Sequence, residues 1–136
     1  MSKIVLVNGV FDVLHRGHIE LLKYAKSIGD VLYVVTDSDE RVRLIKGNNR
    51  PINNVEDRVY ILNAIKYVDK VFVFDTLDEL RSLHRSISPD ILVKGSDWDE
   101  EYIRKNDGVL DKTKIIIFRR IDDYSTTSLI DKMEKL

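Results

Sequence analysis

The chain has 136 residues, and its 43% hydrophobic and 33% charged content is typical of one globular domain over residues 1–136 rather than of a disordered chain. A formal net charge of −1 gives no reason to expect nucleic acid as a partner. The absence of cysteine excludes disulfides, thiolate catalysis and cysteine-ligated metal. Because no apolar run approaches the length of a membrane span and the N-terminus lacks a signal-peptide pattern, we expect a cytoplasmic protein with no membrane partner.

The first predicted elements are a buried strand over the apolar, β-branched residues 3–8 and a helix over residues 19–28. The turn between them holds His15, Gly17 and His18. In an open α/β sheet such a turn is the usual ligand crevice, and the helix that begins there offers backbone N–H groups and a partial positive charge. Gly17 lets the backbone approach a ligand, and the two imidazoles add hydrogen-bond donors. The pattern indicates a phosphate site, with a helix cap or a surface histidine as the alternative.

A second buried strand is predicted over residues 31–35, which completes a strand–helix–strand unit with parallel strands and a right-handed crossover. The polar run Thr36-Asp37-Ser38-Asp39 follows it. We interpret this run as a strand end and helix cap, with a cation site as the alternative. Residues 41–53 combine basic residues with a glycine and a proline, which is typical of a solvated loop.

The rest of the chain alternates helical and strand patterns, except for residues 99–114, which are polar and predict no element. His84 lies beside the apolar stripe of one predicted helix, and we expect it to be structural or at the surface. The predicted helices are 55–65, 77–87 and the segment after Ser125, and the predicted strands are 70–74, 90–95 and 114–118. The sequence therefore predicts an α/β fold, a Rossmann-like three-layer sandwich with a five-stranded parallel sheet.

Two stretches near the C-terminus are candidates for lining the same crevice. Trp98, the only tryptophan, lies in a polar loop after the fourth predicted strand. This position favours a stacking or lid role over burial, with an interface as the alternative. The three hydroxyl residues that open the last helix fit either a simple N-cap or an anion cradle. They are Ser125, Thr126 and Thr127.

The turn that holds the two histidines also carries a family resemblance. Gly9-Val10-Phe11-Asp12 followed by His15-Arg16-Gly17-His18 resembles the HxGH signature of the cytidylyltransferase-like nucleotidyltransferases, and the likeness extends along nearly the whole chain. These are small α/β enzymes that join a nucleoside triphosphate to a phosphorylated acceptor and release pyrophosphate. The resemblance implies catalytic roles for His15 and His18. It also implies nucleotide contacts from Gly9, Val10, Phe11, Asp12 and Gly17.

Three further segments resemble the heptose-phosphate adenylyltransferases or the wider family. Lys46-Gly47, Arg50-Pro51 and Asn53 match the phosphate loop of the heptose enzymes, which implies that Lys46 is catalytic and contacts the triphosphate as a point charge. Residues 89–95 resemble the same enzymes, and Gly95 is then a nucleotide-binding residue. Glu56-Asp57-Arg58 resembles the family's helix-start arginine, so we expect Arg58 to bind nucleotide, with an exposed helix arginine as the alternative.

The C-terminal part also resembles the glycerol-phosphate cytidylyltransferases. Asp97-Trp98 is similar to their base-side loop, and Arg120 matches the arginine of their Arg-Thr-Glu-Gly-Ile-Ser-Thr-Thr pattern. The loop that follows departs from the pattern, because Tyr124 comes after Asp123 with no glycine. In the family the last helix begins with hydroxyl residues that hold the β and γ phosphates. The nucleotide-binding residues implied here are Asp97, Trp98, Arg120, Tyr124, Ser125, Thr126 and Thr127.

The resemblance implies direct in-line transfer without a covalent intermediate. An acceptor phosphate oxygen attacks the α-phosphorus of a nucleoside triphosphate, and pyrophosphate leaves. Mg²⁺ is expected to enter with the triphosphate and to bridge its phosphates mostly through waters, so no protein metal ligands are predicted. ATP and a sugar 1-phosphate of the heptose type are the favoured substrates.

These residues leave the base and the acceptor open. The alternatives are CTP with glycerol 3-phosphate, an FAD synthase-like adenylyl transfer, and a non-catalytic nucleotide-binding module. The heptose enzymes often form one domain of a longer kinase fusion, and this chain shows no kinase half. Family members are commonly homodimers, so the resemblance implies a homodimer.

Overall fold

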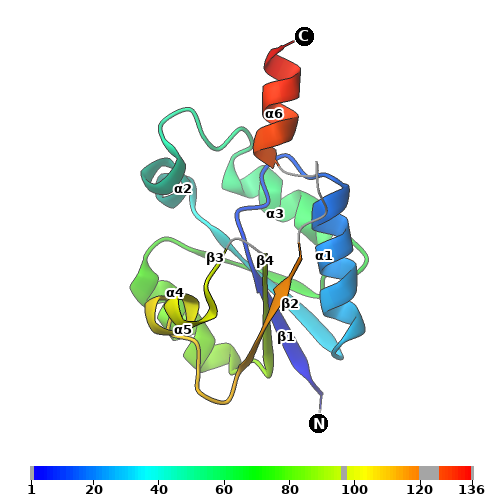
Figure 1. Cartoon of the computed structure of the whole chain (residues 1–136), viewed down its shortest axis with the longest axis vertical. Coiled ribbons are helices and arrows are strands. Elements are labelled where there is room, and N and C mark those ends of the chain that lie inside the picture. The colour runs from blue at the N-terminus through cyan, green and yellow to red at the C-terminus, as the bar shows by residue number, and fades with distance from the viewer. Residues whose placement is uncertain (1, 96–97, 120–125, 136) are drawn as a thin grey trace.

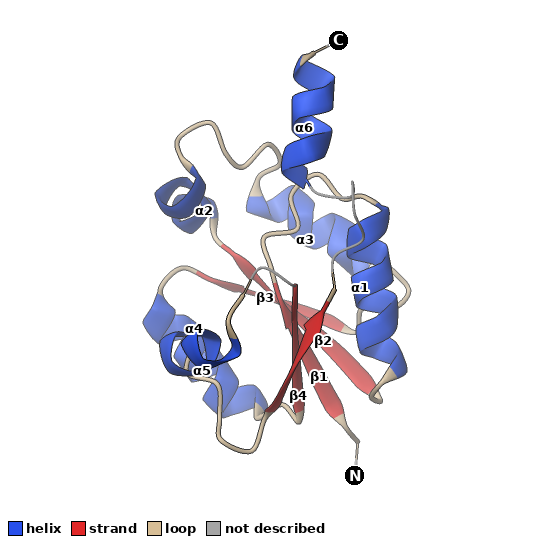
Figure 2. Ribbon diagram, in the orientation of Figure 1, coloured by secondary structure: helices blue, strands red, loops and turns tan. Residues whose placement is uncertain are grey.

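The computed structural model describes residues 2–95, 98–119 and 126–135, and for residues 126–128 the backbone alone. A five-stranded parallel sheet, in the order β3-β2-β1-β4-β5, forms its centre (Figures 1 and 2). In chain order the elements are β1 (Ile4–Asn8), α1 (Arg16–Ser27), β2 (Val31–Asp37), α2 (Asp39–Lys46), α3 (Val55–Asn63), β3 (Lys70–Phe74), α4 (Leu77–Ile87), β4 (Ile91–Gly95), α5 (Glu100–Asn106), β5 (Lys114–Phe118) and α6 (Thr126–Glu134).

Both faces of the sheet are covered, because the central strands are apolar on both faces along most of their length rather than at alternate positions. Successive side chains of a strand point to opposite faces, so Val5 and Val7 join the core beneath α1 and α3, while Leu6 joins the core beneath α4 and α5. Figure 2 shows the two pairs of helices on opposite sides of the sheet. The predicted three-layer α/β sandwich is confirmed.

The strand order reverses direction at the centre of the sheet. β1 pairs with β2 on one side and with β4 on the other, in the registers Val7↔Val34 and Val7↔Val93. The connections that leave β1 and β4 at this point run to opposite faces, which opens a crevice at the carboxyl ends of the two strands. The predicted ligand turn after β1 and the polar loop after β4 therefore lie at this crevice.

Two short helices differ from the prediction. Residues 39–46 form α2, although the composition indicated a solvated loop, and residues 100–106 form α5, although no element was expected there. Each has one buried residue, Val42 in α2 and Ile103 in α5, so neither has the apolar stripe that reveals a helix in a sequence. Capping by Ser38 and by Asp99 starts them instead. The interpretation of Ser38 as a helix cap is confirmed.

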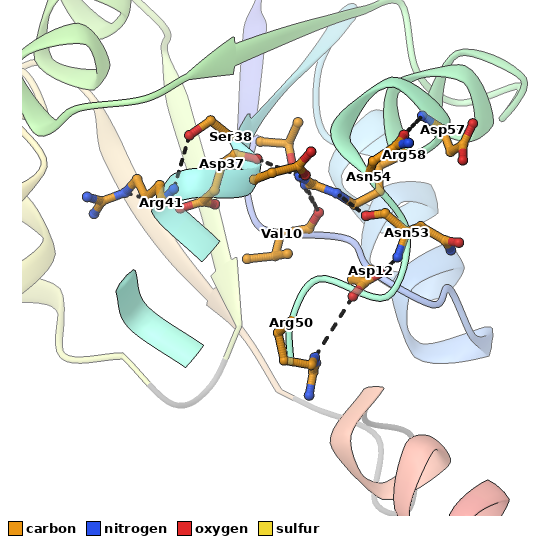
Figure 3. A network of polar contacts seen from close by, with 12 residues as sticks. Val10, Asp12, Asp37, Ser38, Arg41, Arg50, Asn53, Asn54, Asp57 and Arg58 are labelled. Atoms are coloured by element: carbon orange, nitrogen blue, oxygen red, sulfur yellow. Dashed lines mark hydrogen bonds and ion pairs between the residues drawn. The ribbon is translucent and has the colours of Figure 1, made fainter. Parts of the chain in front are cut away.

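Arg58 donates five hydrogen bonds to other parts of the chain beside the sheet. It lies in α3, is 1% exposed, and makes hydrogen bonds with all of its N–H groups, as Figure 3 shows in part. Nε donates to the carbonyl of Asn53 at 3.0 Å, and the two Nη atoms donate to four further oxygens. These belong to the Val10 carbonyl (2.9 Å), Thr36 Oγ1 (2.9 Å), the Asp37 carbonyl (2.8 Å) and Asp39 Oδ1 (2.9 Å).

This geometry corrects the prediction for Arg58. Its donors are used by the chain itself, so the side chain is neither an exposed helix arginine nor placed to hold a nucleotide. It joins the turn after β1, the end of β2 and the start of α3 into one unit. Arg58 is therefore a positioning residue for the crevice.

His84 is buried inside the layer formed by α4 and α5. It is fully buried, and neither ring nitrogen has a hydrogen-bond partner in the part of the chain that the structure describes. Burial lowers the pKa of His84 below its ordinary value of 6.5, and the charge of Asp107 offsets part of this effect. His84 is thus a neutral, structural histidine, as one of the two sequence interpretations held.

We expect Arg58→Lys to lower the free energy of unfolding by about 3 kcal/mol, because lysine cannot satisfy five acceptors and leaves buried carbonyls without donors. Urea denaturation measures this change. The exposed helix residue Arg85 provides the control, since Arg85→Lys should shift stability by less than about 0.5 kcal/mol. A loss for Arg58→Lys as small as that of the control would contradict the positioning role.

For His84 the pKa shift sets a pH dependence. The unfolded chain binds a proton near pH 6.5 that the folded chain excludes, so the free energy of unfolding falls as the pH drops below 6.5. His84→Leu should remove this loss and add about 1–3 kcal/mol at pH 7.5, because two unsatisfied buried nitrogens disappear. Urea denaturation of both proteins between pH 7.5 and 5 checks it. Parallel stability curves for the variant and the wild type would show that His84 is not the titrating group.

Candidate functional site

A pocket of about 430 Å³ opens where the strand order reverses. It is built by the turn after β1, the ends of β2 and β4, and residues of α2 and α5. The predicted site residues that line it are Gly9, Val10, Phe11, Asp12, His15, Gly17, His18, Lys46, Gly95 and Trp98. The structure thus brings together residues from distant parts of the sequence around one cavity.

The two predicted catalytic histidines start helix α1 by capping each other's backbone. His15 is the N-cap, and its Nδ1 accepts a hydrogen bond from the Gly17 N–H at 3.0 Å. His18 Nδ1 accepts from the His15 N–H at 3.1 Å, which closes a reciprocal capping box. The ring centroids lie 4.0 Å apart. The predicted helix start at Ile19 is three residues too late, because the capping box starts α1 at Arg16.

This capping arrangement fixes where each imidazole carries its proton. A neutral imidazole has one N–H and one acceptor nitrogen, and here Nδ1 is the acceptor in both rings. The proton of each ring is therefore on Nε2, the nitrogen at the far side of the ring from the backbone. The same hydrogen bonds cap the helix and leave an N–H donor on each imidazole. Two Nε2–H donors beside a helix N-terminus suit the binding of a phosphate.

The turn that carries these histidines is strained. Phe11 and Val13 have φ angles of 56° and 52°, in the left-handed region that a β-branched residue rarely adopts. Such residues cost of order 1–3 kcal/mol each and persist where their surroundings hold them. Phe11 is held by burial in the core and by a ring contact with His18 at 5.5 Å. The Val10 carbonyl accepts from both Thr36 and Arg58.

Asp12 ties a second segment to the turn. Its buried carboxylate accepts hydrogen bonds from the backbone N–H groups of Ile52 (2.6 Å) and Asn53 (2.9 Å), and Arg50 Nε lies 3.9 Å away (Figure 3). The carboxylate thereby fixes the loop that follows α2 against the phosphate turn. Asp12 also lines the pocket, so its contact with nucleotide stays a prediction beside this positioning role.

Two cations reach the pocket from α2. Lys46 is the last residue of this helix and lines the pocket, as the resemblance implied. Arg41 also lines it, with Nε 3.2 Å from Asp37 Oδ2 and its guanidinium 5.4 Å from the Phe74 ring centroid. The helix that sequence analysis missed is therefore the element that brings both cations to the site.

Sequence analysis also missed a group of charged residues on the far side of the pocket, formed by Asp37, Arg41, Lys94 and Asp107. Burial raises the pKa of Asp37, which the charges of Arg41 and Lys94 oppose. Burial lowers the pKa of Lys94, which the carboxylates of Asp107 and Asp37 oppose. One feature of the sequence could have revealed Lys94. It is a charged residue near the carboxyl end of an otherwise apolar strand, Ile91-Leu92-Val93-Lys94.

Of the remaining predicted residues, only the side chain of Arg58 is described, and the nucleotide contacts of the others stay predictions. Arg58 does not line the cavity but lies behind the turn. Asp97, Arg120, Tyr124 and Ser125 lie outside the described residues. Thr126 and Thr127 begin α6, which extends away from the sheet beyond its carboxyl edge (Figure 1), and only their backbone is described.

Within residues 2–95, 98–119 and 126–135, no group of three or more His, Asp or Glu side chains is arranged to hold a metal ion. The same part of the chain contains no helix that is both long and apolar enough to cross a membrane. The imidazoles, the cations and the helix N-terminus at the pocket are groups that bind phosphate.

Comparison with known proteins identifies the relatives of this chain. The family model for cytidylyltransferase-like proteins matches residues 6–134. The bifunctional protein HldE of Marinomonas sp. (strain MWYL1) is 43% identical over an alignment of 134 residues that covers 96% of this chain and 28% of that protein. HldE of Blochmanniella floridana is 44% identical over 98% of this chain and 28% of its own length. The chain thus spans a little over a quarter of these relatives.

Solved structures agree with this relationship. The lipopolysaccharide core biosynthesis protein from Thermoplasma volcanium GSS1 is 30% identical and superposes with a TM-score of 0.76, over 90% of this chain and 100% of that one. The pantoate-beta-alanine ligase of Francisella tularensis, at 19% identity and a TM-score of 0.60 over 99% of this chain and 71% of its own, shares the fold alone. The resemblance drawn from the HxGH motif is confirmed, and the chain belongs to the cytidylyltransferase-like family.

Proposed function

We propose that this chain is a nucleotidyltransferase that joins the adenylyl group of ATP to a sugar 1-phosphate of the heptose type and releases pyrophosphate. The observation that carries the proposal is the reciprocal capping box of His15 and His18, which presents two Nε2–H groups beside a helix N-terminus in the pocket. The likeness to HldE proteins over nearly the whole chain supports the adenylyl group and the sugar phosphate. A role in making a lipopolysaccharide precursor fits the Thermoplasma relative.

The arrangement supports direct transfer. The acceptor phosphate is already ionised, so its oxygen attacks the α-phosphorus without a general base, and the bond to pyrophosphate breaks in line. Negative charge grows on the phosphate oxygens in the transition state, where the Nε2–H groups of His15 and His18 donate to them. Lys46 neutralises charge on the triphosphate. The N-terminus of α1 contributes its backbone N–H groups and positive end.

Mg²⁺ is proposed as the cofactor. When bound to a triphosphate, Mg²⁺ neutralises charge and orients the phosphates. Because no metal-binding cluster exists among the described residues, the phosphates and waters are proposed to hold the ion, and the chain's part is to bind the triphosphate through Lys46 and α1. A homodimer and a cytoplasmic location are likewise proposals, and they rest on family resemblance.

A second candidate, transfer from CTP to glycerol 3-phosphate, is favoured by the resemblance of Asp97-Trp98 to the base-side loop of the glycerol-phosphate cytidylyltransferases, and Trp98 lines the pocket. Pyrophosphate release with Mg²⁺ separates the two candidates. ATP, CTP, GTP and UTP are each tested against heptose 1-phosphate, glycerol 3-phosphate, phosphocholine and FMN. The proposal expects release with ATP and heptose 1-phosphate. Release confined to CTP and glycerol 3-phosphate would replace it, and tight nucleotide binding with no release for any acceptor would favour a non-catalytic module.

The same assay tests the role of the histidines. We expect His18→Ala to lower kcat by about 10²–10³, the usual loss for one donor to transition-state charge. His84→Leu removes the third histidine, which is buried outside the pocket, and should keep the rate of the wild type. Circular dichroism of both variants checks that α1 still forms. A His18→Ala rate close to that of the wild type would remove His18 from the mechanism.

A further inference from the structure

The side of the pocket opposite the histidines contains a buried lysine that the proposed transfer does not use. Lys94 is the fourth residue of β4 and shares a face with Leu92, so it points into the layer of α4 and α5 rather than toward α1. It is 6% exposed and lines the pocket. A lysine is rarely buried unless a partner compensates the loss of its hydration.

No partner within the described residues holds the ammonium group of Lys94. No hydrogen bond or ion pair is formed by Nζ with residues 2–95, 98–119 or 126–135, and Nζ lies over the Trp98 ring, 4.6 Å from its centroid. The carboxylates of Asp37 and Asp107 act on it electrostatically. The ammonium therefore retains its hydrogen-bonding capacity toward whatever occupies this side of the pocket.

We propose that this side of the pocket, formed by Asp37, Lys94, Asn106 and Asp107, binds the hydroxyl groups of a sugar in the acceptor, with Lys94 as a donor to them. This inference rests on the proposed function, and it assigns the part of the substrate that the phosphate turn does not hold. The phosphate of the acceptor lies at His15 and His18, and its glycosyl part extends toward Lys94.

The charges on this side favour hydroxyl groups over phosphate. Asp37 and Asp107 are negative, whereas Arg41, which pairs with Asp37, and Lys94 are positive, so the group as a whole is close to neutral. Two carboxylates repel a phosphate. Alternating donors and acceptors fit a hydroxyl, which both donates and accepts, and vicinal hydroxyls of a sugar present several such groups together.

The acceptor groups are held rigidly from α5. Arg81 of α4 donates to the Asn106 carbonyl from Nε at 3.1 Å and from Nη2 at 2.8 Å. Asn106 Nδ2 in turn donates to Asp107 Oδ1 at 2.8 Å. Gly108 follows with a φ of 72°, and a Cβ there would lie 2.4 Å from Arg81 Cγ, so the chain ends this helix in close contact with α4. Preorganised groups lose little entropy on binding.

An aromatic surface completes this side. Trp98 and Tyr102 are stacked, with ring planes 11° apart and centroids 6.4 Å apart, and both line the pocket. Trp98 is 49% exposed and Tyr102 is 54% exposed, so part of each ring remains accessible. An apolar ring face beside carboxylates and an ammonium matches a sugar, which has C–H groups on its faces and hydroxyls at its edges. Glycerol 3-phosphate offers fewer of both.

The test uses the full chain and compares Lys94→Met with Lys70→Met. Lys70 provides a matched control because its Nζ also lies over an aromatic ring, 4.9 Å from the Phe72 centroid, but outside the pocket. In pyrophosphate release, Lys94→Met should raise KM for heptose 1-phosphate at least about tenfold, the effect of losing a hydrogen bond to a charged group. KM for ATP should change less than twofold, and Lys70→Met should match the wild type in both.

A second readout does not depend on turnover. Trp98 is the only tryptophan, so its fluorescence reports on this side of the pocket alone. Heptose 1-phosphate should change the signal saturably in the wild type and about tenfold more weakly in Lys94→Met, while inorganic phosphate should compete equally in both. Removing the ammonium leaves the carboxylates of Asp37 and Asp107 without its compensating charge, so urea denaturation is used to confirm that Lys94→Met is folded under the binding conditions.

The outcomes separate the inference from the proposed function. Pyrophosphate release with an unchanged KM for heptose 1-phosphate in Lys94→Met, or a change in KM for ATP alone, would overturn the inference and leave the function standing. No release with any acceptor, together with a saturable Trp98 signal that Lys94→Met weakens, would overturn the function and support the hydroxyl-binding side. The absence of any Trp98 response to heptose 1-phosphate in the wild type would overturn the inference.

Discussion

The hydrogen bonds from two backbone N–H groups to the Nδ1 atoms of His15 and His18 are the interaction on which the site depends. They start α1, close the turn after β1 and leave the proton of each imidazole on Nε2. A serine or aspartate cap would start the helix equally well but would present no N–H donor. Histidine at both positions therefore meets two requirements, a cap for α1 and an N–H donor directed at a phosphate. The phosphate chemistry proposed here follows from the second.

The charged residues around this turn divide into those used by the fold and those directed to the pocket. Arg58 and Asp12 are buried and form hydrogen bonds with the chain itself, so they fix a strained turn and its neighbouring loop in place. Lys46 lines the cavity from α2, and Lys94 lines it from β4. This division gives the pocket a side suited to phosphate and a side suited to hydroxyl groups, which is the arrangement that transfer to a sugar phosphate requires.

The sequence predicted the sheet, its layers and the phosphate turn, because apolar runs and glycine placement report local structure directly. It did not predict α2 and α5, since each buries one residue and depends on a cap. The role of Arg58 was missed for a different reason. Its acceptors, among them Val10 and Asp37, lie far away in the chain, and no local pattern shows that an arginine on a helix is buried by such partners. Lys94 was visible as a charge in an apolar strand, but its surroundings come from α5.

The position of the proton on each of the two imidazoles, and its response to nucleotide, tests their proposed role in phosphate binding most directly. Nitrogen-15 NMR of the three histidines, recorded with and without ATP and Mg²⁺, reports which ring nitrogen carries the proton and which rings the nucleotide touches. We expect Nε2–H tautomers for His15 and His18, nucleotide-dependent shifts at both Nε2 atoms, and no shift at buried His84. Protons on Nδ1 of His15 or His18, or nucleotide binding that leaves both rings unchanged, would contradict the proposed role of the two histidines.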